Sequence, residues 1–377
     1  MPERAILVAV ELRDRERLWN LDDTLSELSY LVRSAGAEVV GIISQRANRY
    51  TPVYLGKGKL QELVELASEL SADVAIFDDE LTPTQQRNLE NGLGIKVIDR
   101  TALILDVFGR HASTHEGQLQ VELAQHQYLL PRLAGQWSHL ERLGGGIGTR
   151  GPGETQLETD RRLVRRRLQK IKEELDGVRV RRSQYMARRK KASVPTASLV
   201  GYTNAGKSTL FNALSNAKVP AADQLFSTLD PVTRRVRLPS GGQLLLTDTV
   251  GFIQKLSPMV VAAFRATLEE LAESDILLHV VDITHPKAPE QTEVVESTLS
   301  ELGLGDRPRL LVINKMDLLA EGDGVLAPTN MPVGDGRPGV LVSAAKGWNL
   351  DLLLGEIENR LIDVDRPLMV AGTGGGV

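Results

Sequence analysis

The segment GYTNAGKST, residues 201–209, restricts the fold of this chain more than any other feature. It has the pattern Gly-x-x-x-x-Gly-Lys-Ser, and it follows an apolar run, residues 196–200, and opens a run with helical spacing. In that setting the glycines let backbone N–H groups surround phosphate groups, and the start of the helix adds positive potential. The motif therefore predicts a phosphate-binding turn between a strand and a helix of an α/β sheet, with a chance match as the alternative.

Three later motifs argue against a chance match, because each follows an apolar run and they come in the order that a GTPase requires. They are DTVG at 248–251, NKMD at 314–317 and SAAK at 343–346. The carboxylate of Asp317 accepts from the two adjacent donors of guanine and would face an acceptor of adenine. The four motifs together predict a GTP-binding domain.

The predicted site residues come from these motifs and from the intervening first switch, residues 223–236. The predicted GTP-binding residues are Gly201, Tyr202, Thr203, Asn204, Ala205, Gly206, Lys207, Ser208, Thr209, Phe226, Ser227, Thr228, Asp248, Thr249, Val250, Gly251, Asn314, Lys315, Asp317, Ser343, Ala344 and Ala345. The groups expected to act in catalysis are Asn204, Lys207, Thr228 and Gly251. The predicted ligands of Mg²⁺ are Ser208, Thr228 and Asp248, with Thr233 as the alternative to Thr228.

One position in the DTVGF segment departs from many GTPases. Phe252 stands where they place a glutamine that orients the attacking water. A phenyl ring can neither orient nor deprotonate water. The sequence therefore predicts slow hydrolysis until another group or a partner completes the site, and Phe252 is a candidate gate.

The rest of the chain predicts two further domains and a tail. Residues 1–110 alternate strand-like and helical runs, which is typical of a small α/β domain with a mainly parallel sheet. Residues 111–192 predict a helical hairpin, with one arm from Gly117 to about Leu143, broken at Pro131, and a second arm from Glu154 to about Lys191. Its tip is the segment GGGIGTRGPGE. The GTPase domain spans 193–365, with a mostly parallel sheet, and 366–377 is a flexible tail.

The second arm is strongly basic, although the net charge of the chain is −4. Residues 161–191 hold 14 Lys and Arg but three Asp and Glu. This concentration predicts RNA binding through phosphate contacts, with a solvated charged helix as the alternative. The candidate RNA contacts are Arg150, Arg161, Arg162, Arg165 and Arg166. The apolar stripe expected to pack on the first arm is Leu157, Leu163, Val164, Leu168, Ile171 and Leu175.

Composition excludes several kinds of function. The chain has no cysteine, which excludes disulfides, thiolate catalysis and cysteine-ligated zinc. His111 and His115 lack neighbouring ligands, so we expect them to be structural or to face RNA. No apolar run approaches the roughly 20 residues of a membrane helix. We therefore expect a soluble, cytoplasmic protein that works as a monomer.

The GTPase motifs, with FSTLDP in the first switch, resemble those of translation-factor-related GTPases. Outside that domain the chain resembles the HflX family, in GKGKL, FDDELTPTQQRNLE, VIDRTALILDVFGRHASTHEGQLQVELAQ and GGGIGTRGPGETQLETDRR. The resemblance covers residues 50 to about 365. It implies a ribosome-associated GTPase that binds the large subunit and is linked to ribosome splitting or rescue, with the hairpin directed toward the peptidyl-transferase region.

The resemblance also bears on how hydrolysis is activated and leaves other functions open. Related GTPases use an asparagine at the position of Asn204 to bind K⁺, and hydrogen bonding to the switch backbone is the alternative. A second function is an ATP-dependent rRNA-remodelling enzyme, in which YLGKGKL, residues 54–60, would contact nucleotide rather than form a turn. A third is a GTP-dependent ribosome-binding module without productive coupling.

Overall fold

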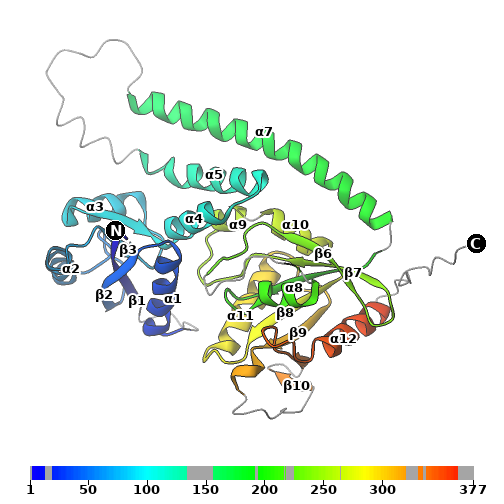
Figure 1. The fold of residues 1–377 in the computed structure, drawn as a ribbon. Coiled ribbons are helices and arrows are strands. Elements are labelled where there is room, and N and C mark those ends of the chain that lie inside the picture. The colour runs from blue at the N-terminus through cyan, green and yellow to red at the C-terminus, as the bar shows by residue number, and fades with distance from the viewer. Residues whose placement is uncertain are drawn as a thin grey trace, which may run out of the picture. The chain divides into compact units, whose positions relative to one another are not determined.

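The computed structural model describes residues 2–12, 19–133, 156–191, 194–215, 217, 225–263, 265–319, 330–333 and 337–363. The chain divides into two compact units, and Figure 1 labels many of their elements. Unit 1 contains Met1–Gly177 and Lys255–Ala263, and unit 2 contains Val178–Gln254 and Phe264–Val377. The first unit therefore includes a short segment that lies inside the second in sequence.

Unit 1 is built on a four-stranded parallel sheet with the strand order β2-β1-β3-β4. Its strands are β1 (Arg4–Leu12), β2 (Glu38–Ala47), β3 (Val74–Phe77) and β4 (Lys96–Asp99). The intervening helices are α1 (Leu21–Ser34), α2 (Lys57–Glu69) and α3 (Pro83–Leu93). Strand β1 is buried without interruption from Ala5 to Val10, as expected for a central parallel strand with both faces covered. The predicted small α/β fold is confirmed.

Local sequence explains where α3 begins and ends. The Thr82 side chain accepts from the backbone of Gln85, whose own side chain accepts from the Thr82 backbone. Pro83 occupies the first turn, where a missing N–H costs nothing. The helix ends at Gly94, whose φ of 70° lies in the left-handed region that glycine adopts readily.

Three helices follow the sheet of unit 1. Helix α4 (Arg100–His111), which starts at an Asp99 cap, was not predicted as a separate helix. Helix α5 (His115–Leu129) ends two residues before Pro131, in agreement with the predicted break. Helix α7 (Gln156–Lys191) matches the predicted basic arm. The glycine-rich tip and the rest of the first arm lie outside the described residues, so the hairpin stays a prediction.

The apolar stripe of α7 is narrower than predicted. Leu168 and Ile171 are buried, but Leu163 is 54% exposed, so its placement in the stripe was wrong. Val164, Leu168 and Ile171 follow the i, i+4, i+7 spacing of one helix face, whereas Leu163 lies about 100° around the helix from Val164. Leu157 is not among the residues whose burial the structure describes.

Unit 2 has a seven-stranded sheet with the order β10-β11-β9-β8-β5-β7-β6. Its strands are β5 (Thr196–Gly201), β6 (Val232–Arg237), β7 (Gln243–Asp248), β8 (Ile276–Asp282), β9 (Arg309–Asn314), β10 (Asn330–Val333) and β11 (Arg337–Leu341). Only the edge strands β6 and β10 run antiparallel to their neighbours among the described pairs. The mostly parallel sheet is as predicted.

The remaining helices belong mainly to unit 2. The helices of unit 2 are α8 (Lys207–Ser215), α10 (Arg265–Glu273), α11 (Ala288–Glu301), the 3₁₀ helix η1 (Met316–Leu318) and α12 (Leu350–Asp363). Helix α9 (Pro258–Ala263) belongs to unit 1 and contacts α4 and α5. Within the described ranges, the structure has no helix with the length and apolar character needed to cross a bilayer.

The burial pattern of α7 generates a stability prediction. Ile171→Ala removes a fully buried side chain, so we expect it to lower the free energy of unfolding by about 2–4 kcal/mol. Leu163→Ala is the control, because it truncates an exposed side chain of the same helix and should change stability by less than about 0.5 kcal/mol. Urea unfolding followed by circular dichroism measures both, and equal effects would contradict the observed burial.

Candidate nucleotide-binding site

The loop between β5 and α8 forms the phosphate-binding turn that the sequence predicted. Gly206 has a φ of 92°, and a Cβ there would overlap the Asn314 amide nitrogen, so only glycine fits. Asn204 also lies in the left-handed region, with a φ of 63°. Asparagine tolerates that region better than most residues, which gives Asn204 a backbone role in addition to any ligand that its amide binds.

Lys207 lies at the start of α8 with its ammonium group directed back into the loop. Its Nζ donates to the carbonyl oxygens of Gly201 (3.1 Å) and Tyr202 (2.8 Å). Burial lowers the pKa of Lys207 to about 8, against the opposing effect of the Asp248 carboxylate. A buried cation whose only described bonds are to carbonyls is well suited to receive a polyanion.

Three oxygen-bearing side chains from three segments meet beside this lysine. The Ser208 hydroxyl donates to Asp248 Oδ2 at 2.7 Å, and the Thr228 hydroxyl does so at 2.9 Å. The two hydroxyl oxygens are themselves 2.8 Å apart. Burial raises the pKa of Asp248, although bonds from these hydroxyls and the charge of Lys207 oppose that rise. A compact set of buried hydroxyl and carboxylate oxygens fits a hard divalent cation such as Mg²⁺.

The alternative threonine of the first switch lies elsewhere. Thr233 is in β6, where its hydroxyl pairs with the Thr247 hydroxyl at 2.9 Å. Thr228 alone of the two candidates reaches Asp248, because the backbone leaves the pocket before β6 begins. The geometry therefore favours Thr228 over Thr233.

The DTVGF segment is joined to the phosphate-binding loop by backbone hydrogen bonds. Phe252 N–H donates to Gly201 O (3.0 Å), and Thr203 N–H donates to Phe252 O (2.7 Å). The Phe252 side chain is fully buried. A Cβ on Gly251 would lie 2.8 Å from Thr203 Cα and 2.9 Å from Lys207 Nζ, so this close approach requires glycine.

The two motifs predicted to bind the base are connected through Asn314. Its amide donates to Ala205 O (2.9 Å) and accepts from Ala344 N–H (3.0 Å), so it ties the phosphate-binding loop to the SAAK segment. The Ser343 hydroxyl donates to Asp317 Oδ1 at 2.7 Å. This bond fixes the carboxylate that the sequence assigned to guanine recognition.

The structure gathers eleven of the 22 predicted GTP-binding residues into one pocket, and the residues predicted to bind the base are not among them. Its lining residues are Thr203, Asn204, Gly206, Lys207, Ser208, Thr209, Phe226, Ser227, Thr228, Thr249 and Gly251. Val250 is buried behind this lining, whereas Ala345 is exposed. The candidate RNA contacts do not line the pocket: Arg161, Arg162, Arg165 and Arg166 lie on α7 in unit 1, and Arg150 lies outside the described residues.

Sequence reasoning missed one residue of this site. Asp282, the last residue of β8, forms an ion pair with Lys315 at 2.7 Å and so orients the NKMD segment. Asp282 and Asn314 are register partners at the ends of neighbouring parallel strands. The position of Asp282 at the end of an apolar run could have identified it from the sequence, because ligand sites of α/β sheets form at the carboxyl ends of the strands.

Comparison with known proteins identifies the family. Family profiles described as "GTP-binding GTPase N-terminal", "GTP-binding GTPase Middle Region" and "50S ribosome-binding GTPase" match residues 22–109, 111–189 and 196–315. The chain is 49% identical to "GTPase HflX" of Caldanaerobacter subterraneus subsp. tengcongensis over 360 residues, which cover 95% of this chain and 81% of the relative. It is also 49% identical to "GTPase HflX" of Escherichia coli over 320 residues, covering 85% and 74%. The chain belongs to the HflX family of GTPases.

A solved structure agrees at the level of the fold. The HflX-family chain aligns with the structure described as "SsGBP and GDP complex" with a TM-score of 0.51 and 24% identity, over 96% of this chain and 99% of that one. This likeness shows a shared fold. Membership of the HflX family makes the chain a GTP hydrolase, and the complete set of nucleotide motifs agrees with that activity.

The pKa of Lys207 gives a pH prediction for this HflX-family GTPase. In the nucleotide-free protein Lys207 loses its proton near pH 8, and bound phosphates would raise that pKa again. Binding of GDP should therefore take up a proton above pH 8, and GDP affinity should fall as pH rises from 7 to 9. Calorimetry in buffers of different ionisation enthalpy measures the uptake.

The control for this experiment is Lys207→Arg, because a guanidinium stays charged over the whole range. It should remove the proton uptake wherever binding is still measurable. Uptake that persists in this variant would assign the titration to another group.

Proposed function

We propose that the pocket binds GTP with Mg²⁺ and that its residues take the roles predicted from the motifs. Lys207 and the backbone N–H groups of the loop hold the phosphates, and Gly251 N–H contacts the γ-phosphate. Ser208, Thr228 and Asp248 are the groups that would hold Mg²⁺, which supplies charge neutralisation at the phosphates when bound. The buried oxygen cluster supports this assignment.

Guanine selection in this proposal rests on Asp317. Its carboxylate would accept from both donors of guanine, while Ser343 and Lys315 hold the surrounding segments in place. Ala344 is held against Asn314 and would lie beside the base. The bonds through Asn314 connect the phosphate-binding loop to the SAAK segment, which supports this proposal.

Hydrolysis needs a further contribution, because the buried Phe252 ring cannot orient water. We propose that the Asn204 carboxamide binds K⁺ at the phosphate edge, where the cation offsets charge that develops during the reaction. Asn204 is exposed and lines the pocket, which supports this role.

The potassium proposal predicts faster GTP turnover in KCl than in NaCl at equal ionic strength. Asn204→Gly is the matched variant, because glycine keeps the left-handed backbone and removes the carboxamide. We expect this variant to lose the difference between the two salts. Equal turnover of the unmodified protein in both salts would exclude the role.

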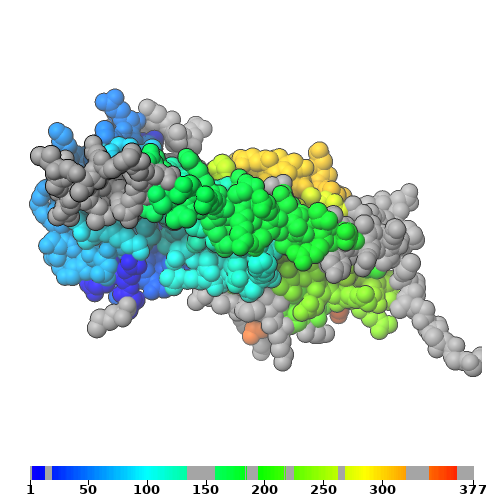
Figure 2. All heavy atoms as spheres, turned by 90° about the horizontal axis from the view of Figure 1, so that it is seen from above, coloured from blue at the N-terminus to red at the C-terminus, as the bar shows by residue number. Residues whose placement is uncertain are grey.

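We also propose that this GTPase binds the large ribosomal subunit through α7 and couples GTP hydrolysis to ribosome splitting or rescue. The observation that carries the proposal is a 36-residue basic helix in a chain that also carries the GTPase motifs. Arg162, Arg165 and Arg166 are exposed, and Arg161 is half-buried. Figure 2 shows α7 uncovered along the face in view. Arginine on an open helix suits repeated contacts with RNA phosphates.

The ribosome proposal predicts that isolated large subunits stimulate GTP turnover in potassium buffer by at least about tenfold, as partner-completed GTPase sites allow. Binding should weaken steeply as salt rises. Arg165→Glu with Arg166→Glu should reduce both binding and stimulation while intrinsic turnover persists. The control is Arg235→Glu with Arg237→Glu, which makes the same charge change on exposed residues of β6.

Each other outcome points to a different function. Subunit binding without stimulation, unchanged by a non-hydrolysable GTP analogue, would favour a binding module. ATP hydrolysis that survives Lys207→Ala would favour an rRNA-remodelling enzyme that uses unit 1. Binding that is insensitive to salt and to the α7 variants would remove the helix from the interface.

A further inference from the structure

The segment from Gly251 to Lys255 joins the nucleotide pocket of unit 2 to unit 1. Gly251 lines the pocket, and the division between the units falls between Gln254 and Lys255. Three residues therefore separate the backbone N–H proposed to contact the γ-phosphate from a side chain that belongs to the other unit. Both ends of this segment are held by specific contacts.

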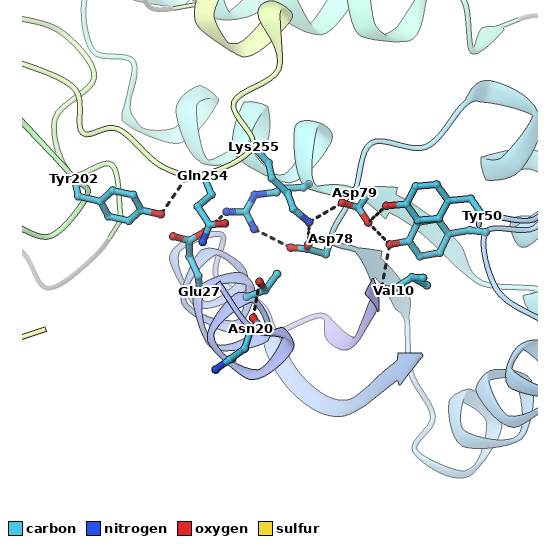
Figure 3. Close-up of polar contacts among 12 residues, drawn as sticks. Val10, Asn20, Glu27, Tyr50, Asp78, Asp79, Tyr202, Gln254 and Lys255 are labelled. Carbon is cyan, nitrogen blue, oxygen red and sulfur yellow. Dashed lines mark hydrogen bonds and ion pairs between the residues drawn. The ribbon is translucent and has the colours of Figure 1, made fainter. Parts of the chain in front are cut away.

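At the pocket end, three hydrogen bonds fix the backbone. Besides the two bonds of Phe252 to the phosphate-binding loop, Gln254 N–H donates to the Tyr202 hydroxyl at 3.0 Å (Figure 3). The Tyr202 side chain is buried, so its hydroxyl has little freedom to move. The backbone from Phe252 to Gln254 is therefore held against the phosphate-binding loop by hydrogen bonds.

At the other end, the Lys255 ammonium binds two consecutive carboxylates that follow β3. It forms an ion pair with Asp78 Oδ2 and another with Asp79 Oδ1 at 2.6 Å (Figure 3). Asp78 is 1% exposed and Asp79 16%, so the ammonium meets acceptors that are largely shielded from water. Buried ion pairs are favourable only with good geometry and further hydrogen bonds to the remaining carboxylate oxygens.

The second oxygen of each carboxylate is held within unit 1. Arg100 donates to Asp78 Oδ1 at 2.8 Å. The hydroxyls of Tyr50 (2.9 Å) and Tyr54 (2.6 Å) both donate to Asp79 Oδ2. Burial alone would raise the pKa of Asp79, but the charge and hydrogen bond of Lys255, together with the hydrogen bonds of the two tyrosines, lower it overall. The carboxylates thus form a rigid, charged receptor for one ammonium group.

The backbone at Lys255 shows that this position is imposed by its surroundings. Lys255 has a φ of 52°, in the left-handed region that side-chain-bearing residues seldom adopt. The chain then enters α9, which packs on α4 and α5. A backbone conformation of this kind persists where neighbouring contacts over-determine it, and such places often serve function.

We propose that Lys255 is a positioning residue for GTP hydrolysis: by binding Asp78 and Asp79, it holds the segment that carries Gly251 in the orientation needed for catalysis. Unit 1 thereby controls the hydrolytic step through the three residues that connect Gly251 to Lys255. The inference rests on the GTP hydrolase activity and is independent of any ribosomal partner.

The physical reason lies in the missing glutamine. Without a side chain that orients water, catalysis depends more on backbone donors that are already in place before the reaction. A segment freed at Lys255 would keep its bonds to the loop only part of the time. Small displacements of positioning groups lower rates far more than they lower ground-state binding.

The first test is steady-state GTP turnover by the full chain carrying Lys255→Ala. We expect kcat to fall by about fivefold or more, with GDP affinity unchanged because GDP has no γ-phosphate for Gly251 to contact. Lys255→Arg keeps the charge and should recover part of the loss. The control is Lys59→Ala, since Lys59 also binds two carboxylate oxygens, both of Glu62, and is 28% exposed against 26% for Lys255.

Two further measurements separate positioning from a structural role. Asp79→Asn should slow turnover as Lys255→Ala does, and the double variant should be no slower than either single one, because both break the same contact. Hydrogen exchange at the Phe252 and Gln254 amides should accelerate in Lys255→Ala. Unchanged kcat in Lys255→Ala, faster turnover, or additive effects of the two substitutions would each overturn the proposal.

Discussion

The parallel arrangement of β5, β7, β8 and β9 is the constraint on which the nucleotide site depends. Because these strands run in the same direction, the loops that follow them emerge at one edge of the sheet. That edge receives the phosphate-binding loop, Asp248, Asp282 and Asn314. Residues 109 positions apart in sequence can therefore bond directly, as the Asn314 amide does with Ala205 O.

The site also places opposite charges in a buried setting. Lys207 and Asp248 are both shielded from water. Burial lowers the pKa of Lys207 and raises the pKa of Asp248, so it favours the neutral form of each group. Such groups are costly unless partners satisfy them, so hydroxyls and carbonyls surround them in the structure. A bound nucleotide with its cation would replace these internal contacts with stronger ones. The buried Lys207 and Asp248, which are costly in the nucleotide-free protein, would thus favour the nucleotide-bound form.

Segment 251–255 runs from the nucleotide pocket of unit 2 into unit 1. At the pocket its backbone pairs with the phosphate-binding loop, and at Lys255 it enters a charged network in unit 1. A fully buried Phe252 between these points has a packing role in this conformation. Phe252, which stands in place of the usual glutamine, is thus part of a strand-like segment that is hydrogen-bonded to the phosphate-binding loop.

Local sequence patterns predicted most elements because they act over short distances. Helix α3 and the break near Pro131 follow from caps and proline geometry, and the GTP motifs follow from phosphate chemistry. Helix α4 was missed because its apolar run begins directly after β4, without a loop to separate them. Leu163 was misplaced because the sequence shows that a residue is apolar but does not show which face of the helix finds a partner.

The sequence by itself predicted a GTP-binding domain, since those motifs carry their chemistry in fixed spacings. It also determined that one helix is strongly basic. Only the tertiary structure decided that Thr228 rather than Thr233 reaches Asp248, that Asp282 orients Lys315, and that Asp78 and Asp79 receive Lys255. These contacts join residues from distant segments, and their partners are set by strand order and packing rather than by local spacing.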